Sequence, residues 1–152
     1  MDRGGTTVWV WGDQLHRDLA HLRGRDPGAT RVLMVVSDRK LGERAWHRQK
    51  LHLVVTAMRR FAAELADEGF AVDLRRAPSM RAGLEAHVDA HAPDAVVAME
   101  PASRTGTATL ARLGVEVVPN DHFLCHWEEF AAFTAGRRRT TMEDFYRWRR
   151  AA

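Results

Sequence analysis

The chain has 152 residues, 45% of them hydrophobic and 28% charged, and its formal net charge of +3 fits one ordinary globular domain rather than two. Its single cysteine, Cys125, excludes an internal disulfide and any iron–sulfur cluster or cysteine-rich zinc site held by this chain alone. The absence of a long apolar run or an apolar N-terminal leader indicates a cytoplasmic protein without a membrane partner.

The first part of the chain predicts two strands. Thr6–Trp11 is rich in β-branched and aromatic residues and indicates a first strand that stops at Gly12-Asp13. Residues 16–24 predict a short, irregular helix. The apolar run Arg31–Ser37 has the length and β-branching of a strand that is buried on both faces.

A long helix is expected after a polar connection over residues 38–45. Its apolar residues recur at three- and four-residue steps from about Ala45 to Glu68, which gives one apolar face. Gly69 is expected to end the helix. Phe70–Arg75 alternates apolar and polar residues and therefore predicts a strand near the edge of the sheet.

The next part repeats the alternation of helix and strand. Ser79 is expected to cap a helix over residues 80–91. Ala95–Met99 then predicts a buried strand, Ser103–Leu113 a helix, and Val115–Val118 a short fifth strand.

This alternation predicts the α/β fold class, with a Rossmann-like, open, parallel five-stranded sheet and helices on both faces. His126–Ala135 and Thr141–Arg150 predict a C-terminal helical extension. We therefore divide the chain into an α/β domain, residues 1–122, and the extension, residues 123–152. The extension is rich in arginine, which we interpret as a solvated face, with attraction of phosphate or an acidic partner as the alternative.

Ligands of such sheets bind outside the carboxyl ends of the strands. Three loops therefore form the candidate site, namely Gly12–Leu15, Ser37–Arg39 and Glu100–Ser103. Gly12 permits a close approach to the backbone, and Asp13 and Gln14 place hydrogen-bonding groups beside it. The alternative is that Asp13 caps the next segment and Gln14 lies at the surface. Because both glycine-rich phosphate-binding patterns are absent, we expect a flat ring system rather than a pyrophosphate.

Two histidine pairs have the i,i+4 spacing of metal ligands, and neither is predicted to bind a metal. His87 and His91 are expected to lie on the exposed face of an amphipathic helix. His122 and His126 flank Cys125, but the expected start of a helix between them disfavours a shared site. We expect Cys125 to be a buried structural thiol.

Three stretches resemble one protein family. VWVWGDQL at 8–15 resembles the opening strand and turn of photolyase-related proteins, and WHRQKLHLVVTAMRRFAAEL at 46–65 resembles their first long helix. FLCHWEEFAAFTAGRRR at 123–139, followed by MEDFYRWRR at 142–150, resembles the end of their α/β domain. The order and spacing of these blocks agree with the bacterial iron–sulfur photolyase and cryptochrome group, whose members resemble (6-4) photolyases.

The resemblance implies a function and its cofactors. The N-terminal domain of such proteins can hold an antenna chromophore, 6,7-dimethyl-8-ribityllumazine, which passes excitation to a flavin. FAD and a [4Fe–4S] cluster belong to a helical domain that this chain does not contain. The chain is therefore expected to bind no DNA lesion directly and to catalyse nothing alone, and a chain carrying the flavin domain is its expected partner.

The resemblance also assigns candidate residues for binding the chromophore. The turn after the first strand is the main candidate, followed by the end of the second strand, the start of the long helix and the end of the fourth strand. These residues are Gly12, Asp13, Gln14, Leu15, Val36, Ser37, Asp38, Trp46, His47, Lys50 and Glu100. Many relatives carry an acidic residue near Val36, and Asp38 is its expected substitute here.

Two other functions stay open at this point. The chain can be a ligand-free interaction module, or the remnant of a truncated photolyase-like protein, whose helical end docks a flavin-domain chain. It can also be a stand-alone nucleotide-binding protein with hydrolase activity, although the missing phosphate-binding loop weighs against this.

Overall fold

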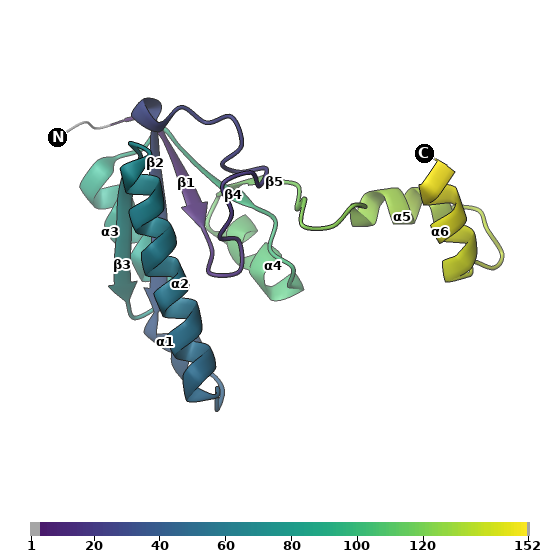
Figure 1. Cartoon of the computed structure of the whole chain (residues 1–152), viewed down its shortest axis with the longest axis horizontal. Coiled ribbons are helices and arrows are strands. Elements are labelled where there is room, and N and C mark those ends of the chain that lie inside the picture. The colour runs from purple at the N-terminus through teal and green to yellow at the C-terminus, as the bar shows by residue number, and fades with distance from the viewer. Residues whose placement is uncertain (1–3, 152) are drawn as a thin grey trace. The chain divides into compact units, whose positions relative to one another are not determined.

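A computed structural model of the chain describes residues 4–151 (Figure 1). The chain forms two compact units with the division after Pro119, whereas the sequence placed the boundary after residue 122. The first unit is an α/β domain and the second is a pair of helices. Among the described residues, none of the helices combines the length and apolar character needed to cross a bilayer.

The first unit is built on one sheet of five parallel strands. The strands are β1 (Thr6–Val10), β2 (Thr30–Ser37), β3 (Ala71–Ala77), β4 (Ala95–Met99) and β5 (Glu116–Val118). Their order in the sheet is β3-β2-β1-β4-β5, and every neighbouring pair is parallel. This confirms the expected Rossmann-like fold, including the edge position of the strand that follows Gly69.

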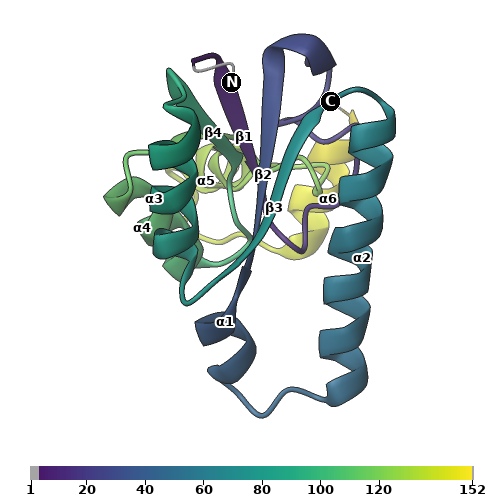
Figure 2. The ribbon, with the colours of Figure 1, turned by 90° about the vertical axis from the view of Figure 1, so that its left-hand side faces the viewer.

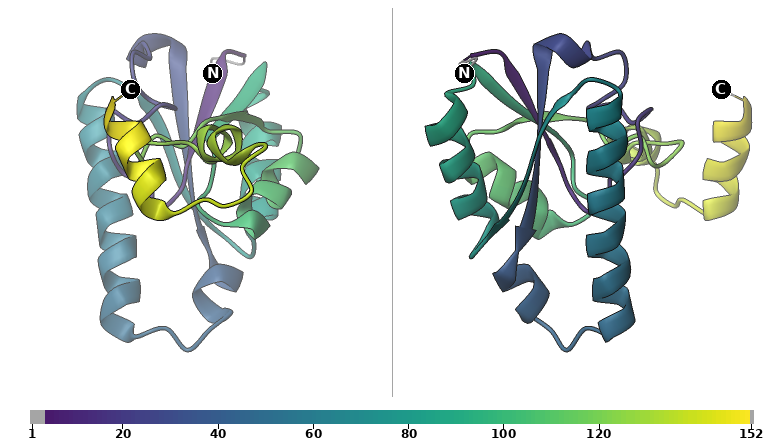
Figure 3. Two further views of the ribbon diagram at one scale, coloured as in Figure 1. Left: turned by 90° about the vertical axis from the view of Figure 1, so that its right-hand side faces the viewer. Right: turned by 60° about the vertical axis from the view of Figure 1, so that its left-hand side comes forward.

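Helices cover both faces of this sheet. They are α1 (Asp38–Gly42), α2 (Arg48–Asp67), α3 (Met80–His91) and α4 (Arg104–Arg112), with a short 3-10 turn, η1, over Pro27–Ala29. The long α2 lies on one face, and α3 lies on the other, as Figure 2 and the right-hand view of Figure 3 show. Connections of this kind, strand to helix to parallel strand, require helices on the faces of the sheet.

The alternation of side chains along the strands produces two separate cores. Val8, Val32 and Met34 are buried against α2, where Met58 and Leu65 complete the cluster. The neighbouring residues of the same strands face the other way and are buried against α3 and α4. This second cluster includes Trp9, Leu33, Val35, Leu84, Ala98 and Leu110.

Serine side chains cap α1, α3 and α4. The Ser79 hydroxyl accepts a hydrogen bond from Ala82 N (3.1 Å), and the Ser103 hydroxyl accepts one from Gly106 N (3.1 Å). The cap at Ser79 was expected. Gly83 in α3 has a different role, because a Cβ there would lie 2.5 Å from a methyl group of Val35. A glycine at this position therefore lets α3 approach β2 closely.

The expected helix over residues 16–24 is wrong, because this segment forms a series of turns. Leu19 and Leu22 are buried, and Leu22 belongs to the core cluster on the α2 face. The Arg17 guanidinium donates to the carbonyl oxygens of Leu22 and Arg25, so a side chain takes the place of helical N–H donors. A second difference is the short helix α1, which forms within the expected polar connection 38–45.

The second unit contains α5 (Trp127–Thr134) and α6 (Met142–Ala151), close to the predicted bounds. A capping box starts α5, in which Glu129 accepts a hydrogen bond from His126 N at 3.1 Å. Aromatic rings join the two helices, with centroids 4.9 Å apart for Phe130 and Phe145 and 5.0 Å apart for Phe133 and Trp148. Phe133 is the buried residue of this small cluster.

Candidate functional site

A pocket of about 310 Å³ lies where β1 and β2 end. Its wall combines the turn after β1, the end of β2, the loop from α1 to α2, and the first half of α2. Figure 2 shows α1 and the start of α2 extending beyond the strands, joined by the loop that follows Gly42. The pocket thus occupies the carboxyl edge of the sheet, where ligands of open α/β sheets bind.

Six of the eleven predicted residues line this pocket. They are Gly12, Asp13, Val36, Ser37, Trp46 and Lys50. They come from three segments that are far apart in the sequence, and the fold brings them to one cavity.

Gly12 allows the turn after β1 to lie directly against α2. A Cβ at this position would be 3.2 Å from Met58 Sδ and 3.2 Å from Val54 Cγ1, which is tighter than ordinary van der Waals contact. Val54 and Met58 are themselves part of the pocket wall. The absence of a side chain at Gly12 therefore sets how closely the two sides of the pocket approach.

Trp46 is fixed on the opposite side by two contacts. Its indole N–H donates to Lys40 O at 3.2 Å, and the Lys50 ammonium lies 4.6 Å from the centroid of its ring. The second contact has the geometry of a cation–π interaction. Together they hold a flat aromatic ring in the wall of the pocket.

The polar groups of the pocket differ in burial and in the hydrogen bonds they already form within the chain. The Ser37 side chain is buried, and its hydroxyl accepts a hydrogen bond from Lys40 N at 3.2 Å as the cap of α1. Asp13 is exposed at the rim. Most of the remaining wall is aliphatic or aromatic, so the pocket offers an apolar surface with a few charged groups at its edge.

The other five predicted residues lie outside the pocket wall. Gln14 is buried, and its amide Nε2 donates to Met99 O (3.2 Å) and Glu100 O (3.4 Å). It therefore ties the turn after β1 to the end of β4. Leu15 packs against the core cluster under α2.

Asp38 and His47 also have other partners. Asp38 Oδ1 accepts from Arg76 Nε at 2.6 Å on the surface. His47 is the N-cap of α2, where Nδ1 accepts from Gln49 N at 3.3 Å. The structure consequently gives Asp38 no place in the pocket wall as a substitute for an acid near Val36.

The sequence reasoning missed the aliphatic part of the wall. These residues are Val35, Leu41, Leu51, Val54, Val55, Met58 and Met80. A signal for some of them was present, because Leu51, Val54 and Met58 belong to the apolar face of α2. With 20 residues, α2 spans about 30 Å, which is longer than the strands it covers. The first part of its apolar face therefore extends past the sheet and lines a cavity.

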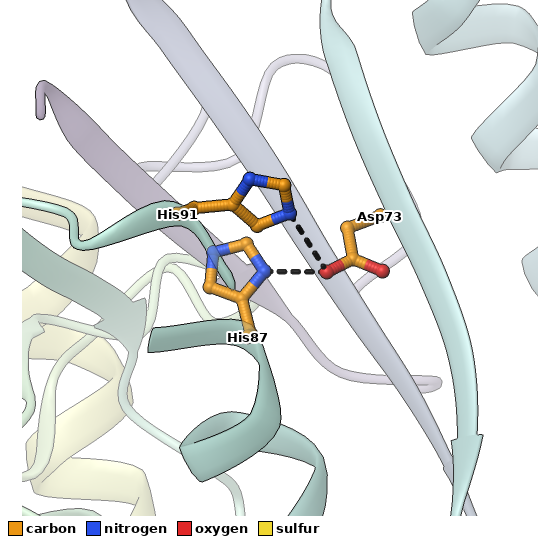
Figure 4. Close-up of side chains that lie close together, drawn as sticks. All are labelled: Asp73, His87 and His91. Carbon is orange, nitrogen blue, oxygen red and sulfur yellow. Dashed lines mark hydrogen bonds and ion pairs between the residues drawn. The ribbon is translucent and has the colours of Figure 1, made fainter. Parts of the chain in front are cut away.

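A second group of polar side chains lies in the amino-terminal half of the sheet, on the face that α3 covers. Asp73 of β3 accepts a hydrogen bond from His87 Nδ1 at 2.6 Å, and His91 Nε2 lies 3.6 Å from the same oxygen (Figure 4). The other nitrogen of His87 is 2.9 Å from the Thr7 hydroxyl. The expectation of exposed histidines on α3 is wrong for His87, which is fully buried. The ring of His87 lies between the sheet and α3, where it contacts the polar side chains of Thr7 and Asp73.

The charges around this group shift two pKa values. Burial acts to raise the pKa of Asp73, but hydrogen bonds from His87 and Arg75 outweigh it and lower the pKa to about 2. Burial lowers the pKa of His91 below its usual 6.5, and the positive charge of Arg31 adds to this effect. Near neutral pH, Asp73 is therefore ionised and His91 is neutral.

Comparisons with known proteins agree with the family that the sequence motifs resemble. Residues 8–152 match a family described as deoxyribodipyrimidine photo-lyase-related protein. A (6-4) photolyase of Agrobacterium fabrum (strain C58 / ATCC 33970) is 29% identical over 152 aligned residues, which cover 92% of this chain. The match covers 30% of that photolyase, so the chain spans about a third of the length of this relative.

Proposed function

The chain belongs to the deoxyribodipyrimidine photo-lyase-related protein family, and on that premise we propose that its α/β unit binds a ribityllumazine-type antenna chromophore. The ligand would be 6,7-dimethyl-8-ribityllumazine, held in the pocket at the ends of β1 and β2. Together with a flavin domain, the unit would take part in light-dependent DNA repair of the (6-4) photolyase type. In this proposal the chain captures light, while FAD and the [4Fe–4S] cluster reside in the domain that carries out catalysis.

The observation that carries the proposal is the apolar pocket bounded by Trp46. Its volume of about 310 Å³ lies at the lower end of the range for small-molecule sites, which is roughly 300–1,000 Å³. A bicyclic ring with methyl groups gains free energy by leaving water for an aliphatic wall. Trp46, held by its bonds to Lys40 and Lys50, offers an aromatic face in the same wall.

The rim of the pocket suits the polar part of such a ligand. A ribityl chain carries hydroxyl groups that donate and accept hydrogen bonds, and the ring carries carbonyl oxygens. The Asp13 carboxylate can accept from a hydroxyl group, and the Lys50 ammonium can donate to an oxygen. Both residues line the pocket and are exposed at its edge.

Titration of the purified chain with 6,7-dimethyl-8-ribityllumazine tests the proposal, with binding followed by the fluorescence anisotropy of the ligand. Leu51→Trp places an indole where the pocket wall is and should abolish binding. Leu53→Trp is the matched control, because Leu53 is on the same helix, is 68% exposed and does not line the pocket. Equal loss in both variants, or no saturable binding to the unaltered chain, would contradict the proposal.

A second role, docking of a flavin-domain chain, is supported by the second unit. Several of its large apolar side chains are exposed, among them Leu124, Trp127, Met142 and Tyr146. Exposed apolar side chains that gather into one patch mark interaction sites. Size-exclusion chromatography with the separately produced remainder of the Agrobacterium (6-4) photolyase, outside the part that this chain matches, tests this role. Co-elution that Trp127→Ala and Tyr146→Ala weaken would support it, and separate elution would count against it.

A further inference from the structure

We propose that Asp73, His87 and His91 form a binding site for a divalent transition-metal ion, with zinc as the preferred metal. The three side chains come from β3 and from the last half of α3. None of them lines the pocket at the ends of β1 and β2. The inference is therefore independent of the proposed function.

The spacing of the ligand atoms carries the proposal. One ligand atom from each residue lies within 4.8 Å of the other two, an arrangement that only these three side chains form among residues 4–151. Zinc bonds of about 2.0–2.2 Å in a tetrahedron place ligand atoms about 3.3 Å apart. Asp73 Oδ2 is 2.6 Å from His87 Nδ1 and 3.6 Å from His91 Nε2, two distances that bracket this value. Small rotations of the side chains would therefore create the site.

The side chains also point in the required directions. Figure 4 shows both imidazole rings turned toward a single oxygen of the Asp73 carboxylate. The ring centroids of His87 and His91 are 4.7 Å apart with an angle of 51° between the planes. Imidazole nitrogens and a carboxylate oxygen are ligands that suit zinc, and the fourth position of the tetrahedron would remain for water.

Thr7 supplies the outer contact that a metal-binding histidine requires. In a neutral His87 ring without metal, Nδ1 carries the proton toward Asp73, because a carboxylate only accepts, and the Thr7 hydroxyl then donates to Nε2 at 2.9 Å. With metal on Nδ1, the proton of the neutral ring would be on Nε2, which would donate a hydrogen bond to the Thr7 oxygen. Thr7 can thus fix either tautomer, as partners of ligating histidines commonly do. We assign Thr7 as a positioning residue.

Two further features favour a cation at this place. His91 is the last residue of α3, where the partial negative charge at the end of a helix attracts positive charge. The His91 side chain is 26% exposed, which gives a metal ion access from solvent, whereas the His87 side chain is completely covered.

Arg75 would compete with a metal ion for the Asp73 carboxylate. Its guanidinium donates to both Asp73 oxygens, with Nε 3.0 Å from Oδ1. Metal binding at Oδ2 would displace the contact from Nη2 and leave the contact from Nε to Oδ1. Removal of the guanidinium should consequently strengthen metal binding. A purely structural hydrogen-bond network predicts no such gain, so Arg75 distinguishes the two interpretations.

Titration of the full chain with Co²⁺ tests the site, because four-coordinate Co²⁺ absorbs visible light. We expect saturable binding of one ion, displaced by one equivalent of Zn²⁺. Binding should be lost in Asp73→Asn and His91→Ala, which avoid truncating the fully buried His87. His52→Ala, which removes an exposed histidine of α2, is the control and should bind as the unaltered chain does.

Two more variants sharpen the result. Thr7→Val should weaken binding by about 10–100-fold, the usual effect of removing an outer partner, while the chain stays folded by circular dichroism. Arg75→Gln should bind Co²⁺ more tightly than the unaltered chain. Absence of saturable binding overturns the proposal, and so does binding that persists in both Asp73→Asn and His91→Ala.

Discussion

The two ends of the central sheet are built in opposite ways. At the carboxyl ends of β1 and β2, α2 extends past the strands, and its aliphatic side chains meet Trp46 across a pocket. In the amino-terminal half, His87 forms hydrogen bonds with Thr7 through one ring nitrogen and with Asp73 through the other. The first arrangement leaves apolar surface for an organic ligand, and the second concentrates charge on one carboxylate. The two arrangements can differ this much because successive side chains of a strand point to opposite faces of the sheet. In addition, α2 is longer than the strands it covers, so part of its apolar face extends past the sheet.

The largest expected effect is the complete loss of one ligand at one end of the sheet while the other end still binds its own ligand. Leu51→Trp should abolish binding of 6,7-dimethyl-8-ribityllumazine, a loss of at least about 100-fold if the indole fills the pocket, and should leave Co²⁺ binding unchanged. His91→Ala should do the reverse. Both ligands are measured on both variants by the titrations described above. A variant that loses both ligands at once would show that the two ends are not independent.

Loss of charge at Asp73 should destabilise the unit. Asp73→Asn removes the charged acceptor that His87 and Arg75 share in a partly buried position, which should cost about 1–3 kcal/mol. Urea unfolding followed by circular dichroism, with EDTA present, measures this cost. The control is Asp38→Asn, whose carboxylate pairs with Arg76 on the surface and should contribute less than about 1 kcal/mol. Equal losses of unfolding free energy in Asp73→Asn and Asp38→Asn would contradict the expectation that the Asp73 carboxylate contributes more than a surface carboxylate.

The free energy of unfolding should depend on pH through the titration of Asp73. The pKa of Asp73 is about 2 in the folded chain and 3.8 as its ordinary value, so the unfolded chain binds more protons at this group in acid. Its stabilising contribution is present above pH 4 and is lost as the pH falls toward 2. Asp73→Asn should flatten the fall in unfolding free energy over that range. An unchanged slope in urea titrations at several pH values would count against the lowered pKa.

Lys50 provides the smallest expected effect. Lys50→Ala removes the ammonium from the face of Trp46 and one polar group from the rim of the pocket. Because cation–π contacts at exposed sites contribute about 0.5–1 kcal/mol, we expect ligand binding to weaken by a few fold. Arg48→Ala, at the first residue of the same helix but outside the pocket wall, should leave binding unchanged.

Much of the fold was predictable because local patterns and packing agree. The apolar run of β2 and the alternation of β3 gave the strands, and Ser79 marked the start of α3. Residues 16–24 were not predictable in the same way, because Arg17 satisfies backbone carbonyls there in place of helical N–H groups. Such contacts between side chain and backbone depend on the folded chain and leave no periodic signal.

The candidate site was predictable at the level of loops and only partly at the level of residues. The rule for parallel sheets located Gly12, Asp13 and Ser37 at the correct edge. It also pointed to the loop at Glu100, but Gln14 closes the space between β1 and β4 by bonding to Met99 and Glu100. The burial of His87 was missed for a related reason, since the periodicity of α3 does not show that Thr7 and Asp73 lie opposite.

The central claim is that the pocket at the ends of β1 and β2 holds the chromophore. Titration of Leu51→Trp and Leu53→Trp side by side with 6,7-dimethyl-8-ribityllumazine tests it most directly. We predict saturable one-to-one binding to the unaltered chain and to Leu53→Trp, and none to Leu51→Trp. Equal affinity of the two variants, or no binding to the unaltered chain, would contradict the claim.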